Sequence, residues 1–253
     1  MNKLAVQLWT FRKQLEKDAE ETLRKIKLIG FNHVELAGTA GHNPADFALL
    51  LNKHELKVVG IHQPSPMLWP KVSELVGEYT VHLELFGCHH LVLLTDAWTK
   101  LDSSYYEHYS ERLSQIHRDI DDTVSISVHP YHTDFLPQSG MNGKSGMRIV
   151  NEKATAELLI EPDLHWVACS NRPFREALSC WEGRIKMVHL NGTSGAKIQQ
   201  PLDIDSETRG ALDWLIEMDL ECGIIEHDCA EPLSWCESSR NNLLTELNEI
   251  AIG

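Results

Sequence analysis

The sequence lacks a dense run of basic residues, which argues against the most common way of binding nucleic acid. Its 253 residues contain 23 Lys and Arg against 37 Asp and Glu, for a formal net charge of −14. Proteins that bind DNA or RNA neutralise phosphates with Lys and Arg side chains. We therefore expect no nucleic-acid partner, while the acidic balance is compatible with a cation site.

Long apolar runs are also missing. No stretch of 18 or more apolar residues occurs, whereas a membrane-spanning helix needs about 20, so no membrane partner is expected. The opening residues, Met1 to Trp9, become polar too early for a signal peptide and suit a first β-strand. The expected location is the cytoplasm.

The six cysteines include no Cys-x-x-Cys pair. This absence removes the support for a zinc ribbon or a thioredoxin-like redox motif. In a chain without a recognisable signal peptide, free thiols are expected rather than disulfides.

What the sequence does contain is a regular alternation of short β-forming runs with longer segments of helical spacing. The runs are residues 4–8, 33–36, 57–62, 90–94, 124–129, 158–163, 185–190 and 222–226. They start roughly 25 to 40 residues apart, the length of a βα unit. Eight such units predict an α/β fold, a single (β/α)₈ TIM barrel that spans residues 1–253 as one domain.

Helices are predicted between the runs, most clearly over residues 18–29, 45–54, 105–120 and 207–219. The first of these is acidic at its start and is closed by Gly30, which matches helix polarity and a C-terminal glycine. The glycine-containing segment 137–153 is predicted to be a long loop. An open doubly wound sheet would need a glycine-rich phosphate loop after the first run, and the sequence there, Trp9 to Lys13, has no glycine.

Ionisable residues stand at the ends of most runs, where a TIM barrel builds its active site. They are Glu35, His62, His129, Asp163, His189 and Glu226, with His132 and Asp134 just beyond the fifth run. A single residue of this kind more often faces water or caps a helix. Three successive runs that end in Asp163, His189 and Glu226 favour a function, either as a metal site or as an acid–base site.

Six segments, taken in order, resemble the sugar phosphate isomerase/epimerase family of xylose isomerase-like TIM barrels. They are LAVQLWTFR at 4–12, GFNHVELAG at 30–38, VHPYHTDF at 128–135, DLHWV at 163–167, GRIKMVHL at 183–190 and IEHD at 225–228. The corresponding family patterns are I-G-V-Q-L-Y-T-x-R, G-Y-x-x-V-E-L-x-G, Y-H-N-H-D-F-E-F, D-L-Y-W-V, G-R-I-x-x-V-H-L and V-E-Q-D. The resemblance covers most of the chain.

The resemblance implies a divalent metal ion, Mn²⁺, Mg²⁺, Co²⁺ or Zn²⁺, as cofactor. Carried over position by position, the implied ligands are Asp134, Asp163, His189 and Glu226, with Asp134 standing where the family has Glu. Glu35, His62 and His132 are implied as substrate-binding groups. His129 is left as either an alternative ligand or an acid–base group.

The sequence also departs from the family patterns. His129-Pro130-Tyr131 replaces the H-N-H stretch, Asn191-Gly192 replaces a Lys-Asp pair, and Ser170 stands where a glycine is expected. The predicted metal ligands are thus kept while the expected substrate contacts change. This pattern indicates either a divergent specificity or a barrel that has lost catalysis.

The leading prediction is an isomerase or epimerase of a sugar or polyol, with Glu226 as the proton-transferring catalytic group and His129 as its partner. A dehydratase of an inosose-like keto-polyol begins with the same proton abstraction and stays open, as does a non-catalytic barrel. A DNA-repair role like that of endonuclease IV is disfavoured, because Trp166 replaces the His of an Asp-x-x-His pair. The predicted partner is a small sugar or polyol, and a homo-oligomer stays open.

Overall fold

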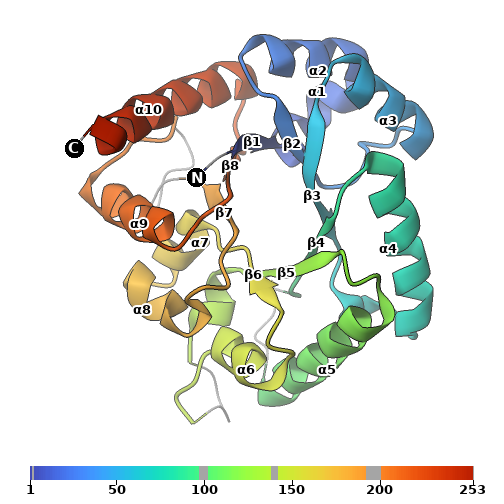
Figure 1. Cartoon of the computed structure of the whole chain (residues 1–253), viewed down its shortest axis with the longest axis vertical. Helices are drawn as coiled ribbons and strands as arrows, with labels where there is room; N and C mark the ends of the chain where they lie inside the picture. The colour runs from blue at the N-terminus through green and yellow to red at the C-terminus, as the bar shows by residue number, and fades with distance from the viewer. Residues whose placement is uncertain (2, 97–101, 138–141, 192–200, 253) are drawn as a thin grey trace.

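The computed structural model describes residue 1 and residues 3–96, 102–137, 142–191 and 201–252. Eight parallel strands form its sheet, in the order β6-β5-β4-β3-β2-β1-β8-β7. They are β1 (Lys3–Gln7), β2 (His33–Leu36), β3 (Lys57–Gln63), β4 (His90–Leu94), β5 (Ser125–His129), β6 (Leu159–Ile160), β7 (Met187–Leu190) and β8 (Cys222–Ile225). Two isolated bridges, Ile160 with Ile185 and Asp163 with His189, join the two end strands. The sheet therefore closes into the predicted (β/α)₈ barrel, seen end-on in Figure 1.

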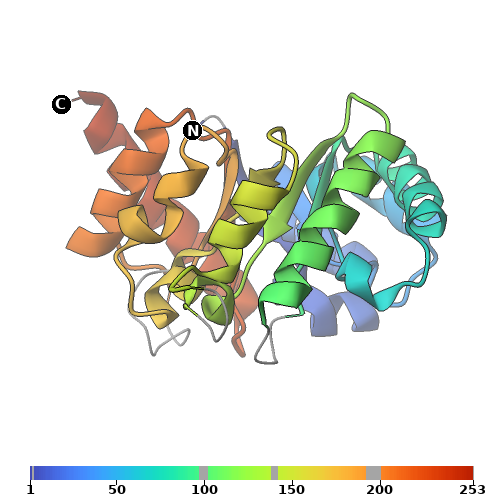
Figure 2. The same ribbon diagram turned by 90° about the horizontal axis from the view of Figure 1, so that it is seen from below.

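Helices surround the barrel on its outside, as both views show (Figures 1 and 2). They are α1 (Arg12–Lys17), α2 (Ala19–Leu28), α3 (Pro44–Lys53), α4 (Val72–Phe86), α5 (Ser103–Asp119), α6 (Gly146–Lys153), α7 (Leu164–Cys169), α8 (Phe174–Leu178), α9 (Ser206–Glu217) and α10 (Pro232–Ile252). Among the helices of the described residues, none is both long enough and apolar enough to span a bilayer.

Local sequence signals explain where several helices begin and end. Asp18 caps α2 by accepting a hydrogen bond from the backbone N–H of Glu21, and Asp102 caps α5 in the same way. After α4 the chain turns at Gly87, whose φ of 59° is readily adopted by glycine. The helices predicted at 18–29, 45–54, 105–120 and 207–219 correspond to α2, α3, α5 and α9.

One predicted element is wrong in part. Within the segment 137–153, predicted to be a loop, residues Gly146–Lys153 form α6, with Ser145 as its N-cap. Residues 138–141 of that segment lie outside the described residues. The helix has buried apolar positions at Met147, Ile149 and Val150, so packing against the barrel outweighs the glycine that begins it.

Side chains alternate along the strands between the helical layer and the barrel interior, as the two-residue period of a strand requires. The interior contains a small apolar cluster of Ala5, Val92, Met187, Cys222 and Ile224. Two residues further along several of these strands, the inward side chains become polar, and this change positions the candidate site. All six cysteines are free, as predicted.

Candidate metal centre and active site

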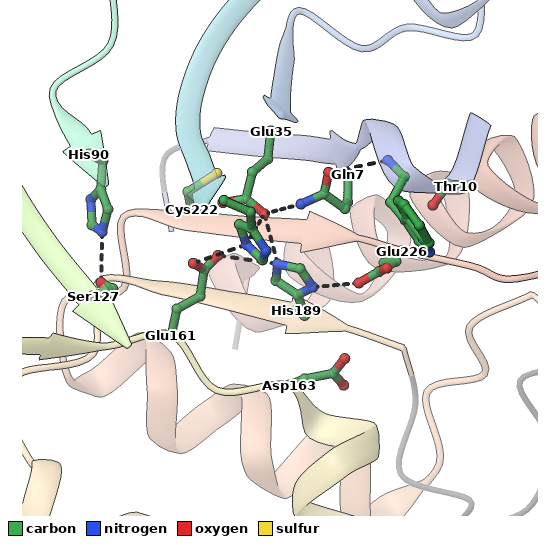
Figure 3. A network of polar contacts seen from close by, with 12 residues as sticks. Gln7, Thr10, Glu35, His90, Ser127, Glu161, Asp163, His189, Cys222 and Glu226 are labelled. Atoms are coloured by element: carbon green, nitrogen blue, oxygen red, sulfur yellow. Dashed lines mark hydrogen bonds and ion pairs between the residues drawn. The ribbon is translucent and has the colours of Figure 1, made fainter. Parts of the chain in front are cut away.

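The imidazole of His189, on β7, lies at the centre of the polar interior (Figure 3). Its Nδ1 is 2.8 Å from Oε2 of Glu226, which follows β8. On the other side of the ring, Nε2 is 2.8 Å from Oε2 of Glu35 and 3.2 Å from Oε1 of Glu161. The two ring nitrogens therefore face two different sets of carboxylates.

Two further histidines converge on the same region. The Nε2 atom of His62, on β3, is 3.0 Å from Oε2 of Glu35 and 3.6 Å from Oε2 of Glu161. Ring centroids are 4.9 Å apart between His62 and His129, 4.7 Å between His129 and His189, and 5.3 Å between His62 and His189. Three imidazoles and two carboxylates thus share the barrel interior.

Glu35 is held in this interior by its neighbours. Its side chain is fully buried and Oε2 accepts a hydrogen bond of 2.7 Å from Nε2 of Gln7, on β1. Gly60 pairs with Glu35 across the β2–β3 ladder. A Cβ at Gly60 would lie 2.5 Å from Oε1 of Glu35, so the missing side chain provides the space for this carboxylate.

Two groups of residues could each hold a metal ion, because in each group one possible ligand atom per residue lies within 4.8 Å of all the others. We call Asp163, His189 and Glu226 the outer triad. We call His62, His129, Glu161 and His189 the deep cluster. His189 belongs to both groups.

The outer triad stands where strands six, seven and eight end. Asp163 is almost fully buried; Oδ1 accepts a hydrogen bond from the backbone N–H of His165, and Oδ2 accepts one from Nδ2 of Asn191, each 2.7 Å long. The side chain of Glu226 is 23 % exposed and gives the triad its access to solvent. Asn191 therefore supports Asp163, where the family pattern has Lys, while Gly192 lies outside the described residues.

Asp134, the fourth predicted ligand, belongs to neither group. It lies in a 3-10 helix, His132–Phe135, that follows β5, and it is fully buried. Its oxygens accept hydrogen bonds from the hydroxyls of Thr95 and Tyr106 and from the backbone N–H of Tyr131, at 2.5, 2.6 and 2.8 Å. The structure thus shows Asp134 joining α5 and the β4 and β5 loops, and its role as a ligand stays a prediction.

The interior charges stabilise one another. Burial alone would raise the pKa of Glu35, but the positive charges and hydrogen bonds of His62 and His189 hold it well below its usual range. Burial would likewise lower the pKa of His62, yet Glu35 and Glu161 raise it to about 9. The pKa of His129 falls well below its usual value through burial and the nearby histidines.

The two carboxylates of the outer triad differ in basicity. Burial raises the pKa of Asp163 to about 7; His189 opposes this shift and the charge of Glu226 adds to it. For Glu226, burial would raise the pKa, but the hydrogen bond and charge of His189 bring it below its usual value. Glu226 is therefore the carboxylate that stays ionised and open to solvent near pH 7.

The predicted substrate-binding residues occupy different depths. Glu35 is fully buried and the His62 side chain is only 8 % exposed, so both are inside the barrel. His132 is half-buried, with its ring centroid 5.8 Å from that of Trp166. Their binding roles stay predictions; His62 belongs to the deep cluster, and Glu35 contacts it through His62 and His189.

Two residues of the polar interior did not figure among the predicted site residues. Glu161 lies two positions before Asp163, so strand periodicity places both acidic side chains on the same side, and this spacing was the available signal. Gln7 lies inside the first predicted run, at 4–8, and carried no signal of its own, because its partner Glu35 is 28 residues away.

The buried donor atoms of the interior are suited to a metal ion. Among the residues that the structure describes, no hydrogen-bond partner is found for four buried atoms: both carboxylate oxygens of Glu161, Oε1 of Glu35 and Nδ1 of His129. Buried polar atoms are rarely left in this state unless an ion or water completes them. Histidine nitrogens and carboxylate oxygens are also the donor types that Zn²⁺ and Mn²⁺ accept.

A cavity of about 560 Å³ opens elsewhere, lined by Lys71, His108 and Arg112 among others, next to α4 and α5 on the outside of the barrel. No residue of the outer triad or the deep cluster lines it. We locate the candidate site by its side-chain chemistry, because a concave surface alone identifies no reaction.

Among protein-family models and curated protein sequences, none matches this chain. Several solved structures, in contrast, are similar to it over nearly their full length. A sugar phosphate isomerase/epimerase from Parabacteroides distasonis has a TM-score of 0.78 at 14% identity, over 96% of this chain and 98% of the other. The IOLI protein with a binding zinc atom has a TM-score of 0.68 at 13% identity, over 98% of both chains. The probable 3-DHS dehydratase AsbF of Bacillus anthracis has a TM-score of 0.71 at 13% identity, over 96% and 98%.

At these identities the similarity establishes a shared fold. It confirms the predicted (β/α)₈ barrel over nearly the full length of both chains.

Proposed function

We propose that this protein is a metal-dependent isomerase or epimerase of a sugar or polyol. The observation that carries the proposal is the outer triad, in which an imidazole and two carboxylates from the ends of three successive strands can bind one ion. A proton-transferring enzyme of this kind needs a metal site, a base and access for a small polar molecule, and the triad region offers all three.

The outer triad would hold the ion, with Asp134 as the predicted fourth ligand. A divalent ion there would act as a Lewis acid toward adjacent carbonyl and hydroxyl oxygens of a substrate. His189 is positioned for ligation because its Nε2 atom, 2.8 Å from Glu35 Oε2, can donate to that carboxylate and so leave Nδ1 for the ion.

Glu226 is our proposed proton-transferring group. Glu226 is ionised near pH 7, because His189 lowers its pKa. Its side chain is partly exposed, so a substrate can reach it. Of the two roles left open for His129, the structure favours that of a ligand, since its side chain lies among two other imidazoles and is 4 % exposed. We therefore assign proton transfer at the substrate carbon to Glu226 alone.

The solved structures with the same fold support this choice of reaction class. One is described as a sugar phosphate isomerase/epimerase and another contains zinc. A third solved structure, described as a probable dehydratase, supports the dehydratase alternative. Dehydration would begin with the same proton abstraction as isomerisation.

The test is turnover of a panel of ketoses, keto-polyols and their epimers in the presence of Mn²⁺, Co²⁺ or Zn²⁺. We expect the wild-type protein to convert at least one of them. Glu226→Gln should lower the rate by about 10²–10⁴-fold, the usual contribution of an acid–base group. Glu157→Gln, an exposed carboxylate outside the site, should leave the rate unchanged and serves as the matched control.

Product analysis separates the alternatives. A product isomeric with its substrate supports the proposal, and a product lighter by one water identifies a dehydratase. Full turnover by Glu226→Gln would remove the assignment of the base. If the metal-loaded wild-type protein converts none of the panel, the non-catalytic barrel becomes the better description.

A further inference from the structure

We propose that the deep cluster is a second metal site, distinct from the outer triad, which binds Zn²⁺ or a similar divalent transition-metal ion inside the barrel. Its ligands would be His62, His129, Glu161 and His189. The proposal does not depend on the reaction assigned above, because it concerns different donor atoms and is tested by metal content.

The cluster has the composition and compactness of a zinc site. Three imidazoles and one carboxylate each offer a ligand atom within 4.8 Å of the others, and four donors of this kind suit the tetrahedral coordination of Zn²⁺. All four side chains are buried. The three histidines lie on β3, β5 and β7, and Glu161 follows β6 directly, so none comes from a long loop. A site on strands is held more rigidly than one on loops.

Unpartnered donor atoms are the second, independent sign of an ion. Glu161 is fully buried. Its oxygens form ion pairs with His189 at 3.2 Å and His62 at 3.6 Å, but within the described part of the chain neither oxygen accepts a hydrogen bond. The Nδ1 atom of His129 is equally without one. An ion among these side chains would complete the coordination of atoms that the protein itself leaves incomplete.

The charge of the region is consistent with a dication. The two buried carboxylates, Glu35 and Glu161, carry two negative charges. A divalent ion would balance them with all three histidines neutral, which is the state in which imidazole binds metals. Without an ion, two of the histidines have to be protonated to reach the same balance.

Sharing of His189 connects the two sites. Nε2 faces Glu161 and the deep cluster, while Nδ1 lies 2.8 Å from Glu226 and the outer triad. An ion in the deep cluster would bind Nε2 and leave the Nδ1 proton to Glu226, the usual arrangement in which a carboxylate orients a ligating histidine. Because binding at both nitrogens would require the loss of both ring protons, we expect an ion in one site to weaken binding in the other.

The decisive experiment counts zinc in a protein whose outer triad has been disabled. Asp163→Asn with Glu226→Gln removes both carboxylates of the triad and leaves the deep cluster intact. After loading with Zn²⁺ and dialysis, this double variant should retain about one ion per chain by elemental analysis. The addition of His129→Gln and Glu161→Gln should reduce this to none.

A matched control uses an exposed histidine and glutamate. His117→Gln with Glu157→Gln removes a surface pair whose atoms are 3.8 Å apart, and in the same double-variant background it should leave the zinc content unchanged. If the Asp163→Asn, Glu226→Gln protein retains no zinc, the deep site is overturned. It is also overturned if zinc persists after His129→Gln and Glu161→Gln.

Cobalt provides a readout that does not depend on comparing folded variants. Co²⁺ bound by four donors absorbs visible light much more strongly than hydrated Co²⁺, so the double variant alone should develop these bands on titration. Their absence would overturn the proposal even if the quadruple variant fails to fold. Failure of the enzymatic proposal would appear separately, as a lack of turnover by a wild-type protein that binds metal.

Discussion

At the scale of single residues, Gly60 determines whether Glu35 can occupy the interior. A methyl group there would meet Oε1 of Glu35 at 2.5 Å and the end of Met187 at 2.9 Å. Because Glu35 is also bound to Gln7 and His189, it cannot move away freely. We expect Gly60→Ala to lower the free energy of unfolding by about 1–3 kcal/mol, the usual cost of overpacking, as measured by urea denaturation.

The control is another glycine with free space around it. Gly77 lies in α4, and a Cβ there would meet nothing within 4 Å. Gly77→Ala should therefore raise the free energy of unfolding by about 0.5–1 kcal/mol, because alanine favours a helix. If Gly60→Ala matched the wild type in stability, the close approach to Glu35 would not constrain the interior as we argue.

The residue scale also shows how far the sequence could predict the site. Asp163, His189 and Glu226 were predicted because each ends a strand run, and the structure brings all three together. Glu161 was overlooked because it sits inside its run, although its two-residue spacing from Asp163 directs both side chains inward. The stagger of the strands around the barrel determines that Glu161 lies deep and Asp163 near the mouth. A single sequence does not reveal that stagger.

At the scale of elements, Asp134 links α5 to the loops that follow β4 and β5. The Tyr106 hydroxyl donates to its Oδ1 at 2.6 Å, in a fully buried position. Tyr106→Phe leaves a buried carboxylate oxygen without this donor, so we expect a loss of about 1.5–3 kcal/mol, typical of a hydrogen bond to a charged group. Tyr109→Phe, which removes a hydroxyl that donates to the backbone carbonyls of Leu93 and Leu94, should cost about 0.5–1.5 kcal/mol.

Denaturation curves of the two phenylalanine variants, recorded side by side, test this difference. Equal losses would indicate that Asp134 is not held as a charged acceptor. Metal analysis of Asp134→Asn tests the other predicted role of Asp134. If Asp134 is a fourth ligand, the substitution should lower the metal affinity of the outer triad and leave that of the deep cluster unchanged.

The sequence predicts the strands better than it predicts β6 and α6, for physical reasons. The strand runs were found because buried parallel strands are rich in β-branched and aliphatic residues. β6 was expected over 158–163 and has only the two residues Leu159 and Ile160, because its partner β7 contacts it through isolated bridges. α6 was missed because Gly146 begins it, and that glycine is needed where a Cβ would collide with the ring of Tyr106 at 2.1 Å.

At the scale of the whole molecule, the barrel could be predicted because eight repeated βα units leave few other ways to bury so many strands. Convergence of the site follows from that closure, since residues as far apart as Glu35 and His189 meet only when the sheet is a ring. On the outside of the ring, α10 contacts the barrel through a hydrogen bond between Ser239 and His227, the residue after Glu226.

We expect His227 to make the stability of the protein depend on pH. Its ring is buried, Nε2 is 2.8 Å from the hydroxyl of Ser239, and its backbone N–H donates to Oγ1 of Thr10. Burial lowers its pKa to about 4, against about 6.5 when unfolded. Between these two values the unfolded chain binds the proton more readily than the folded chain, so stability falls as the pH drops from about 6.5 toward 4 and is fully present above.

We therefore expect acidification from pH 7 to pH 5 to cost the wild-type protein about 2 kcal/mol more than His227→Gln, a variant with no ring to protonate. Urea denaturation at the two pH values measures the difference, in which other titrating groups largely cancel. His89→Gln, at an exposed position, should keep the wild-type dependence. An equal loss in the wild type and in His227→Gln would mean that the junction of β8, β1 and α10 tolerates a charge, and that the acid sensitivity of the barrel originates in the carboxylates and histidines of its interior.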